Sequence, residues 1–158
     1  MALFRFGIDE YKIFGDRKLP FDPGNTNMSR KRISHAMDVV NLEEAFDGIE
    51  EYWDPKLAGE LNGQAVKLAK VKGEFVWHHH EDADELFYVH AGELTIEVED
   101  EPDVVLGPGE FTVVPRGVEH RPVATEETEI MLFETRDTVN TGNVETERTK
   151  TTLDRLDE

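Results

Sequence analysis

Glycine and proline interrupt the middle of the chain at short intervals, and this spacing is the feature that most constrains the fold. The runs between them are rich in valine, isoleucine, phenylalanine and threonine, which favour extended structure. Short strands at this spacing are typical of an all-β sandwich or barrel. We predict strands at residues 64–71, 74–80, 85–90, 93–99, 103–106, 109–114, 119–124 and 128–135, separated by Gly63, Gly73, Gly92, Pro102, Gly107-Pro108-Gly109 and Arg116-Gly117.

The run at residues 93–99 shows the strand pattern most clearly. Leu94, Ile96 and Val98 alternate with a threonine and three glutamates. Successive side chains of a strand point to opposite faces of the sheet. The run therefore predicts a strand with one buried face and one face in water.

A short helix is expected before the strands. Asn41 has the side chain of a good N-cap, and Glu44 stands three residues later, where a capping box places its acidic partner. We predict a helix at about 41–48 that ends at Gly48. Its apolar residues recur at helical spacing, which indicates a helix packed against the outside of the sheets: Leu42, Ala45, Phe46 and Ile49.

Residues 73–92, GEFVWHHHEDADELFYVHAG, contain the first candidate metal ligands. On an extended segment, His78 and His80 project to one side and His79 to the other. A short acidic turn follows, and Glu85 then opens the next strand. If that strand folds back, Glu85 faces the two imidazoles.

Residues 109–120, GEFTVVPRGVEH, supply a fourth candidate. A strand leads into a turn built on Pro115 and Gly117, and His120 follows the turn. The two segments together predict one metal site with four protein ligands: His78, His80, Glu85 and His120.

These segments resemble the two signature motifs of the cupin superfamily. The first motif corresponds to Gly73, His78, His80, Glu85 and Gly92, and the second to Gly109, Pro115, Gly117 and His120. The resemblance spans roughly residues 60–135. It implies a cupin-type double-stranded β-helix, or jelly-roll barrel, with a short N-terminal helix and a polar tail. Within the superfamily, the resemblance points to single-domain, conserved-barrel cupins of the sugar-phosphate isomerase-like group.

Two positions depart from the motifs. Four residues rather than five separate Gly73 from His78, and Ala124 stands where the family tends to have asparagine. Neither change falls on a candidate ligand, so the metal prediction stands.

Three imidazoles and one carboxylate suit Mn, Fe, Co, Ni, Cu or Zn. They do not suit Ca or Mg, which prefer oxygen ligands. The pattern does not discriminate among the transition metals. In an octahedral complex, four protein ligands leave two positions for water, substrate or dioxygen, so the site is suited to catalysis.

Other residues have weaker signals. His79 points away from the proposed site, and His35 and His90 lie outside both motifs. Glu134 shares a strand face with two apolar residues, so it is a candidate base or hydrogen-bond acceptor inside the barrel, although a carboxylate facing solvent is the commoner case. Phe87 and Phe111 are candidates for lining the pocket or filling the core.

The chain has 17 basic and 35 acidic residues among 158, a formal net charge of -18. Such a surface repels nucleic acid and anionic membranes, and it is typical of proteins adapted to high salt.

Cysteine is absent, which excludes disulfides and thiolate ligands. No run of eighteen apolar residues and no signal-peptide pattern is present, so we expect a soluble cytoplasmic protein.

The charge changes sign near Met37. Residues 1–37 contain seven basic and four acidic residues, which leaves 10 basic and 31 acidic residues for the remainder. We predict a poorly ordered N-terminal extension at 1–36, a cupin domain at 37–136 and a polar tail at 137–158 that adds an edge strand or wraps a partner subunit. The alternative for the extension is a translation start at Met28 or Met37.

The residues leave two functional hypotheses open. The first is a small metalloenzyme, isomerase-like or dioxygenase-like. Because residues 73–115 contain no lysine or arginine to hold a phosphate, its substrate is predicted to be neutral or weakly charged. The second is a module that binds or senses metal and ligand without turnover. Under both, a small-molecule ligand and a homodimer are expected, because small barrels expose sheet edges and an apolar outer face.

Overall fold

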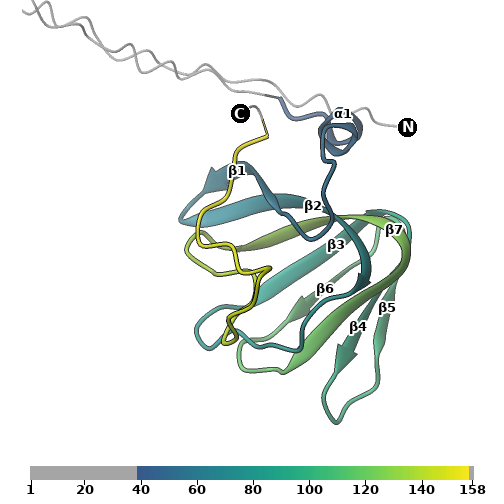
Figure 1. Ribbon diagram of the computed structural model, residues 1–158, viewed down its shortest axis with the longest axis vertical. Coiled ribbons are helices and arrows are strands. Elements are labelled where there is room, and N and C mark those ends of the chain that lie inside the picture. Colours follow the sequence, from purple (N-terminus) through teal and green to yellow (C-terminus); the bar gives the residue numbers. More distant parts are fainter. Residues whose placement is uncertain (1–38, 157–158) are drawn as a thin grey trace, which may run out of the picture. The chain divides into compact units, whose positions relative to one another are not determined.

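The computed structural model describes residues 39–156 and confirms the all-β class (Figure 1). One short helix precedes seven strands within these residues. In chain order the elements are α1 (Leu42–Asp47), β1 (Lys56–Leu61), β2 (Gln64–Glu74), β3 (Glu85–Ala91), β4 (Leu94–Val98), β5 (Val104–Leu106), β6 (Phe111–Val114) and β7 (His120–Thr135).

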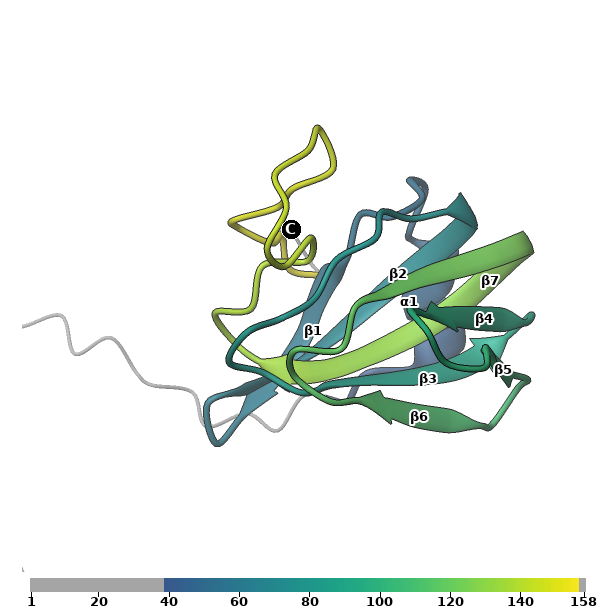
Figure 2. The ribbon, with the colours of Figure 1, turned by 90° about the horizontal axis from the view of Figure 1, so that it is seen from below.

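All strand pairs are antiparallel, and β7 connects the two halves of the barrel. The main path of the sheet runs β1-β2-β7-β3-β6, while β4 pairs with β5 and with β7. The first residues of β7 pair with β4, and its later residues lie between β2 and β3 (Figure 2). This arrangement is the expected jelly-roll barrel.

Four of the eight predicted strands, at 85–90, 93–99, 103–106 and 109–114, lie within two residues of their observed bounds, and three features differ. The two strands predicted at 119–124 and 128–135 form the single strand β7. The separate strand predicted at 74–80 is wrong, because β2 continues to Glu74 and only His78 forms an isolated bridge beyond it. Strand β1 was not expected; it forms a hairpin with β2 through Asn62 and Gly63, both at positive φ.

The inside of the barrel is mostly apolar. Its buried residues come from every strand except β1 and form one cluster. The cluster contains Trp53, Ala69, Val71, Phe87, Val89, Leu94, Ile96, Leu106, Val114, Ala124, Ile130 and Leu132. Burial of this apolar surface is the main force that closes the two halves on each other.

Helix α1 lies outside the barrel, as predicted. The Asn41 side chain accepts hydrogen bonds from the amides of Glu43 and Glu44, which satisfies donors that the first helical turn leaves free. Phe46 of the helix and Ile49 just after it are buried against Leu68 on the outer side of β2.

The tail after β7 folds back on its own barrel. The amide of Leu57 donates to Asp154, and the amide of Leu156 donates to Leu57, so the end of the tail lies beside β1. The predicted extension at 1–36 lies outside the described residues. Within residues 39–156, no helix has the length and apolar character needed to cross a membrane.

Gly92, the last glycine of the first motif, sits where another residue would not fit. Its φ is +89°, and a Cβ there would lie 2.5 Å from Thr128 Oγ1 and 2.9 Å from the carbonyl oxygen of Glu127. Thr128 is buried and hydrogen-bonded to Glu93, so it cannot move aside easily. Glycine is therefore required for the close approach of β7 to this turn.

We predict that Gly92→Ala destabilises the fold by roughly 2–4 kcal/mol in urea unfolding, from backbone strain and the clash with Thr128. Gly63→Ala is the matched control. Gly63 also has positive φ, at +77°, but a Cβ there meets nothing within 4 Å, so only the backbone cost of about 1 kcal/mol is expected. Equal losses for both variants would refute the packing argument.

Candidate metal centre

The backbone bridge between His78 and His120 and the starts of β3 and β7 bring the four candidate ligands together inside the barrel. His78 and His120 exchange both backbone hydrogen bonds, at 3.0 and 2.9 Å. His120 opens β7 and Glu85 opens β3, while His80 lies two residues beyond His78. All four side chains are buried, with at most 6% exposed.

The turns that carry the ligands are joined to each other. The amide of Gly117 donates to the carbonyl oxygen of His80 at 2.7 Å. The amide of Arg116 donates to the carboxylate of Asp84, which precedes Glu85, at 3.0 Å. The turn of the second motif therefore fixes the backbone of the first, and this linkage explains why a tight Pro-x-Gly turn precedes His120.

Backbone carbonyls fix the orientation of two imidazole rings. Nδ1 of His78 lies 2.9 Å from the carbonyl oxygen of Val76, and Nδ1 of His120 lies 2.9 Å from that of Val118. A carbonyl oxygen only accepts, so Nδ1 carries the proton in both rings. The lone pair of each ring is then on Nε2. Metal-binding histidines are commonly held by such a bond.

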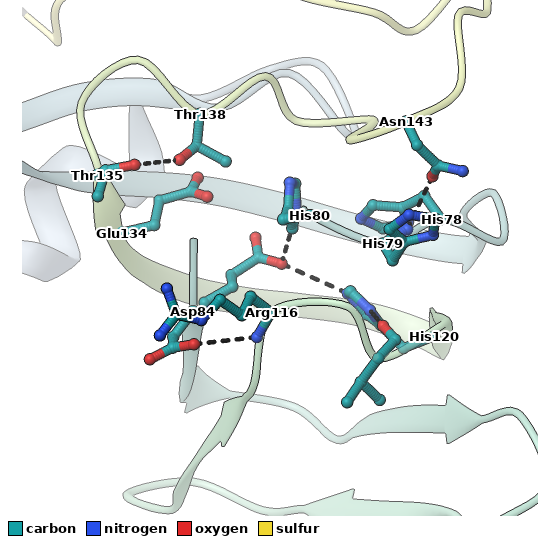
Figure 3. A network of polar contacts seen from close by, with 12 residues as sticks. His78, His79, His80, Asp84, Arg116, His120, Glu134, Thr135, Thr138 and Asn143 are labelled. Atoms are coloured by element: carbon teal, nitrogen blue, oxygen red, sulfur yellow. Dashed lines mark hydrogen bonds and ion pairs between the residues drawn. The ribbon is translucent and has the colours of Figure 1, made fainter. Parts of the chain in front are cut away.

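The remaining polar atoms converge on one point. Oε2 of Glu85 lies 3.2 Å from His80 Nε2 and 3.4 Å from His120 Nε2 (Figure 3). Within the described residues, these three buried atoms have no hydrogen-bond partner. One ligand atom from each of the four residues lies within 4.8 Å of the others. Metal bonds of about 2.1 Å place adjacent ligands about 3 Å apart and opposite ligands about 4.2 Å apart. The donor set therefore fits a transition metal.

The pKa values of His78 and Glu85 favour their ligand forms at neutral pH. Burial, with the neighbouring His120, lowers the pKa of His78 to about 4, so this imidazole is neutral. Burial would raise the pKa of Glu85, but the facing imidazoles of His120 and His80 outweigh it and hold the pKa at about 2. The pKa of His80 is raised instead: burial lowers it, but the carboxylates of Glu85 and Glu134 together outweigh burial, so a bound metal would have to displace the proton that Glu85 favours on this ring.

A small open cavity of about 40 Å³ lies against the cluster. His78 and Glu85 form part of its wall, and most of the other lining side chains are apolar or aromatic. These are Trp53, Pro55, Ala69, Val71, Phe75, Phe87, Pro122, Ile130 and Leu132, with Asn140 of the tail as the remaining polar residue. Such a mixture of an apolar wall and a few polar groups is typical of small-molecule sites.

Glu134 lies inside the barrel, with 1% of its surface exposed, rather than in solvent. Lys67 of β2, also 1% exposed, donates to Glu134 Oε1 at 2.8 Å. Burial and the charge of Glu85 raise the pKa of Glu134 to about 7. Lys67 was missed by the sequence reasoning, although its position in phase with the inward residues Ala65 and Ala69 was a usable signal.

The other residues considered from sequence lie away from the cluster. His79 faces Glu119, with Nδ1 at 2.7 Å from the carboxylate, and His90 stacks on Phe46. His35 lies outside the described residues. Phe87 lines the cavity, but the expectation for Phe111 is wrong: it is 63% exposed, because strand alternation places it on the outer face of β6.

The tail also contacts the histidine run. Asn143 forms two hydrogen bonds with His79: its amide donates to the carbonyl oxygen of His79 at 3.0 Å, and its side-chain oxygen accepts from the amide of His79 at 2.9 Å (Figure 3). His79 lies between two candidate ligands, so the tail helps to fix the backbone of His78 and His80. No sequence pattern predicts this contact, which joins residues 64 positions apart.

The family model of the cupin domain matches residues 66–135. The chain is 45% identical to a cupin-2 domain containing protein from Shewanella frigidimarina NCIMB 400, whose crystal structure superposes with a TM-score of 0.60 over 62% of this chain and 95% of that chain. It is 28% identical to protein NMB1881 from Neisseria meningitidis, with a TM-score of 0.58 over 62% of this chain and 99% of that chain.

Among curated proteins, the chain resembles the uncharacterized protein YdbB of Bacillus subtilis (strain 168). The two are 45% identical over 62 residues, which is 39% of this chain. The match spans about half of that relative, 55% of its length.

We predict that Gly142→Ala loosens the tail from the histidine run. Gly142 has φ +52°, and a Cβ there would collide with the backbone carbonyl of His79. Hydrogen exchange at the amides of His79 and Asn143 should become roughly tenfold faster or more. Gly109→Ala is the control, because Gly109 has φ +84° and open space around it. Unchanged exchange in Gly142→Ala would show that the contact does not hold the tail.

Proposed function

The chain belongs to the cupin superfamily, and on that premise we propose that it binds a divalent transition metal through His78, His80, Glu85 and His120. We further propose that it is a small metalloenzyme, isomerase-like or dioxygenase-like, that acts on a neutral or weakly charged small molecule. The support for the metal is the convergence of three buried ligand atoms that have no other partner in the described residues.

Without a cation, this cluster is unfavourable. A carboxylate oxygen and two imidazole nitrogens face one another at 3.2 and 3.4 Å. Buried polar atoms without partners cost about 1–3 kcal/mol each. A shared metal ion satisfies all of them at once. Its identity among Mn, Fe, Co, Ni, Cu and Zn depends partly on availability.

When bound, the metal would supply Lewis acidity toward a carbonyl or hydroxyl oxygen, or a place for dioxygen. The chain supplies the remaining functions. The apolar wall of the cavity contacts the apolar part of the substrate. The reactive oxygen of the substrate lies at the part of the wall formed by His78 and Glu85. Glu134, with its pKa raised to about 7, is the candidate proton acceptor.

The cavity supports a neutral substrate. None of its lining residues in the described part is lysine or arginine. The nearest buried cation, Lys67, is already paired with Glu134. A phosphate would thus lack the positive groups that usually bind it.

The alternative is a binding or sensing module that holds metal and ligand without turnover. One observation favours it: Glu134 shares its carboxylate with Lys67 in a buried ion pair and does not line the cavity. A carboxylate committed to that pair would not act as a base. The metalloenzyme and the binding module are distinguished by one observation, namely whether Glu134 lies within hydrogen-bond reach of the bound substrate.

We place the protein in the cytoplasm and keep the predicted domain bounds, with an extension at 1–36, a cupin domain at 37–136 and a tail at 137–158.

We also propose a homodimer. Two apolar rows cross the outer face of the sheet and carry no charge, whereas the chain as a whole has a net charge of -18. The rows are Val66, Phe133, Leu86 and Val113, and Leu68, Met131, Tyr88 and Phe111; the helix region covers Leu68 and Met131, and the exposed ends of the two rows are Val113 and Phe111.

We predict that sedimentation gives a species of twice 18.0 kDa at the working salt concentration. Phe111→Glu should shift it toward monomer, because it places like charges across a two-fold interface. Val105→Glu is the matched control, since Val105 is 56% exposed but lies on β5, outside both rows. Wild-type protein that sediments only at 18.0 kDa would refute the dimer.

We predict that His80→Ala and His120→Ala each lower metal affinity by at least about 100-fold, measured by titration and by metal analysis of the purified proteins. Changes to groups that merely orient a ligand already cost 10–100-fold, and these substitutions remove a ligand. Unfolding should remain cooperative, because the core does not depend on the metal.

His79→Ala is the internal control and should keep stoichiometric metal, because His79 faces Glu119. If His79→Ala loses metal while His80→Ala keeps it, the alternation assigned to this run is off by one residue. A wild type that stays metal-free after exposure to Mn, Fe, Co, Ni, Cu and Zn would contradict the proposed site.

A further inference from the structure

The ion pair between Lys67 and Glu134 crosses the inside of the barrel. Each side chain is only 1% exposed, and Nζ lies 2.8 Å from Oε1. Nζ also donates to the carbonyl oxygen of Thr138 at 3.1 Å. The ammonium has three N–H donors, so one remains without an acceptor in the described residues. Oε2 of Glu134 is likewise buried without a partner there.

Stability does not explain this pair. A buried ion pair loses the hydration of both charges, and apolar side chains of similar volume often stabilise a fold equally well or better. An unpaired buried acceptor adds a further cost. The pair therefore combines a large desolvation cost with unused hydrogen-bonding capacity, which is the pattern expected of a site that completes its bonds with a ligand.

The pair is aligned with the candidate metal centre. Register places Ala65 of β2 opposite Glu134 and Phe133 of β7 opposite Leu86 of β3. The next step of that register brings Glu134 opposite Glu85. Lys67 of β2 is opposite Leu132 and reaches Glu134 diagonally, so its ammonium, the Glu134 carboxylate and the ligand Glu85 come from three neighbouring strands. Figure 3 shows the Glu134 carboxylate directed toward His80.

The side chains beside Lys67 on the inner face of β2 are small. Ala65 and Ala69 flank Lys67 on the inner face of β2, and neither side chain extends beyond a methyl group. Lys67 also lines a hollow between the barrel and the tail, together with Thr138 and Lys150. The pair thus lies between this hollow and the ligand cluster.

We propose that Lys67 and Glu134 form a recognition subsite for a hydroxyl group of the substrate. A hydroxyl donates to Oε2 of Glu134 and accepts from the third N–H of Lys67, so it satisfies both. A carboxylate would be repelled by Glu134, an ammonium would be repelled by Lys67, and a methyl group would leave both unpaired. The proposal rests on the proposed function, because it names the class of substrate: a small neutral molecule with one oxygen for the metal and a hydroxyl nearby.

The test compares two neutral probes with the same number of heavy atoms, hydroxyacetone and butanone. Both have a ketone oxygen, and the hydroxyl of one replaces a methyl group of the other. Binding is followed by amide chemical shifts of the full-length protein, with zinc and without metal. Wild-type protein should bind hydroxyacetone at least about tenfold more tightly, because the hydroxyl meets two charged partners.

The decisive variant is Lys67→Met/Glu134→Leu, which leaves no buried charge unpaired. The preference for hydroxyacetone should fall to about unity, while zinc content and cooperative unfolding are retained. Lys56→Met is the control: it removes a different and more exposed ion pair, Lys56 with Asp54 at 2.7 Å, and should keep the preference. If the pair were only structural, the double variant would lose stability and keep the preference.

Three results would overturn the subsite: equal binding of the two probes to wild-type protein, no binding of either, or an unchanged preference in the double variant. Failure of the metal site has a different signature. In that case zinc does not bind, yet metal-free protein still prefers hydroxyacetone, and this preference is lost in Lys67→Met/Glu134→Leu.

Discussion

The interaction on which the rest of the site depends is the meeting of three buried lone pairs, on Glu85 Oε2, His80 Nε2 and His120 Nε2. Such atoms repel one another unless a proton or a metal ion lies between them, so they do not assemble unaided. The surrounding backbone holds them there. The bridge between His78 and His120 sets one side of the cluster, and the hydrogen bond from Gly117 to His80 sets the other. The jelly-roll barrel thus works as a frame that fixes ligands in advance of a metal.

The cluster has two unlike sides. Toward the cavity, apolar and aromatic walls surround His78 and Glu85 and favour the apolar part of a small molecule. Toward β2, the buried Lys67–Glu134 pair offers one donor and one acceptor. A ligand that touches both sides would need an apolar body and adjacent oxygens. The tail contributes to this arrangement by holding His79, and its polar residues form part of the hollow beside Lys67.

The sequence was sufficient where periodicity and turn chemistry agree. The alternation of residues 93–99 predicted β4, and the spacing of the histidines predicted which side chains face inward. Strand β1 was missed because its sequence, KLAGEL, lacks β-branched and aromatic residues and contains a glycine, although Asn62-Gly63 is a strong hairpin signal. Lys67 was overlooked because lysine is seldom buried. The tail contacts join distant residues through backbone groups and the single side chain of Asn143, which leave no periodic pattern in the sequence.

X-ray absorption at the edge of the bound metal is the most direct test of whether the metal binds at the His78, His80, Glu85 and His120 cluster, because it reports the ligands themselves. For wild-type protein loaded with one equivalent of zinc, we expect nitrogen and oxygen neighbours at about 2.0–2.2 Å, with outer-shell scattering from about three imidazoles. In His120→Ala loaded at higher zinc concentration, the imidazole signal should fall by about one ring. A spectrum without imidazole scattering, or one identical in wild type and His120→Ala, would show that the metal does not bind at this cluster.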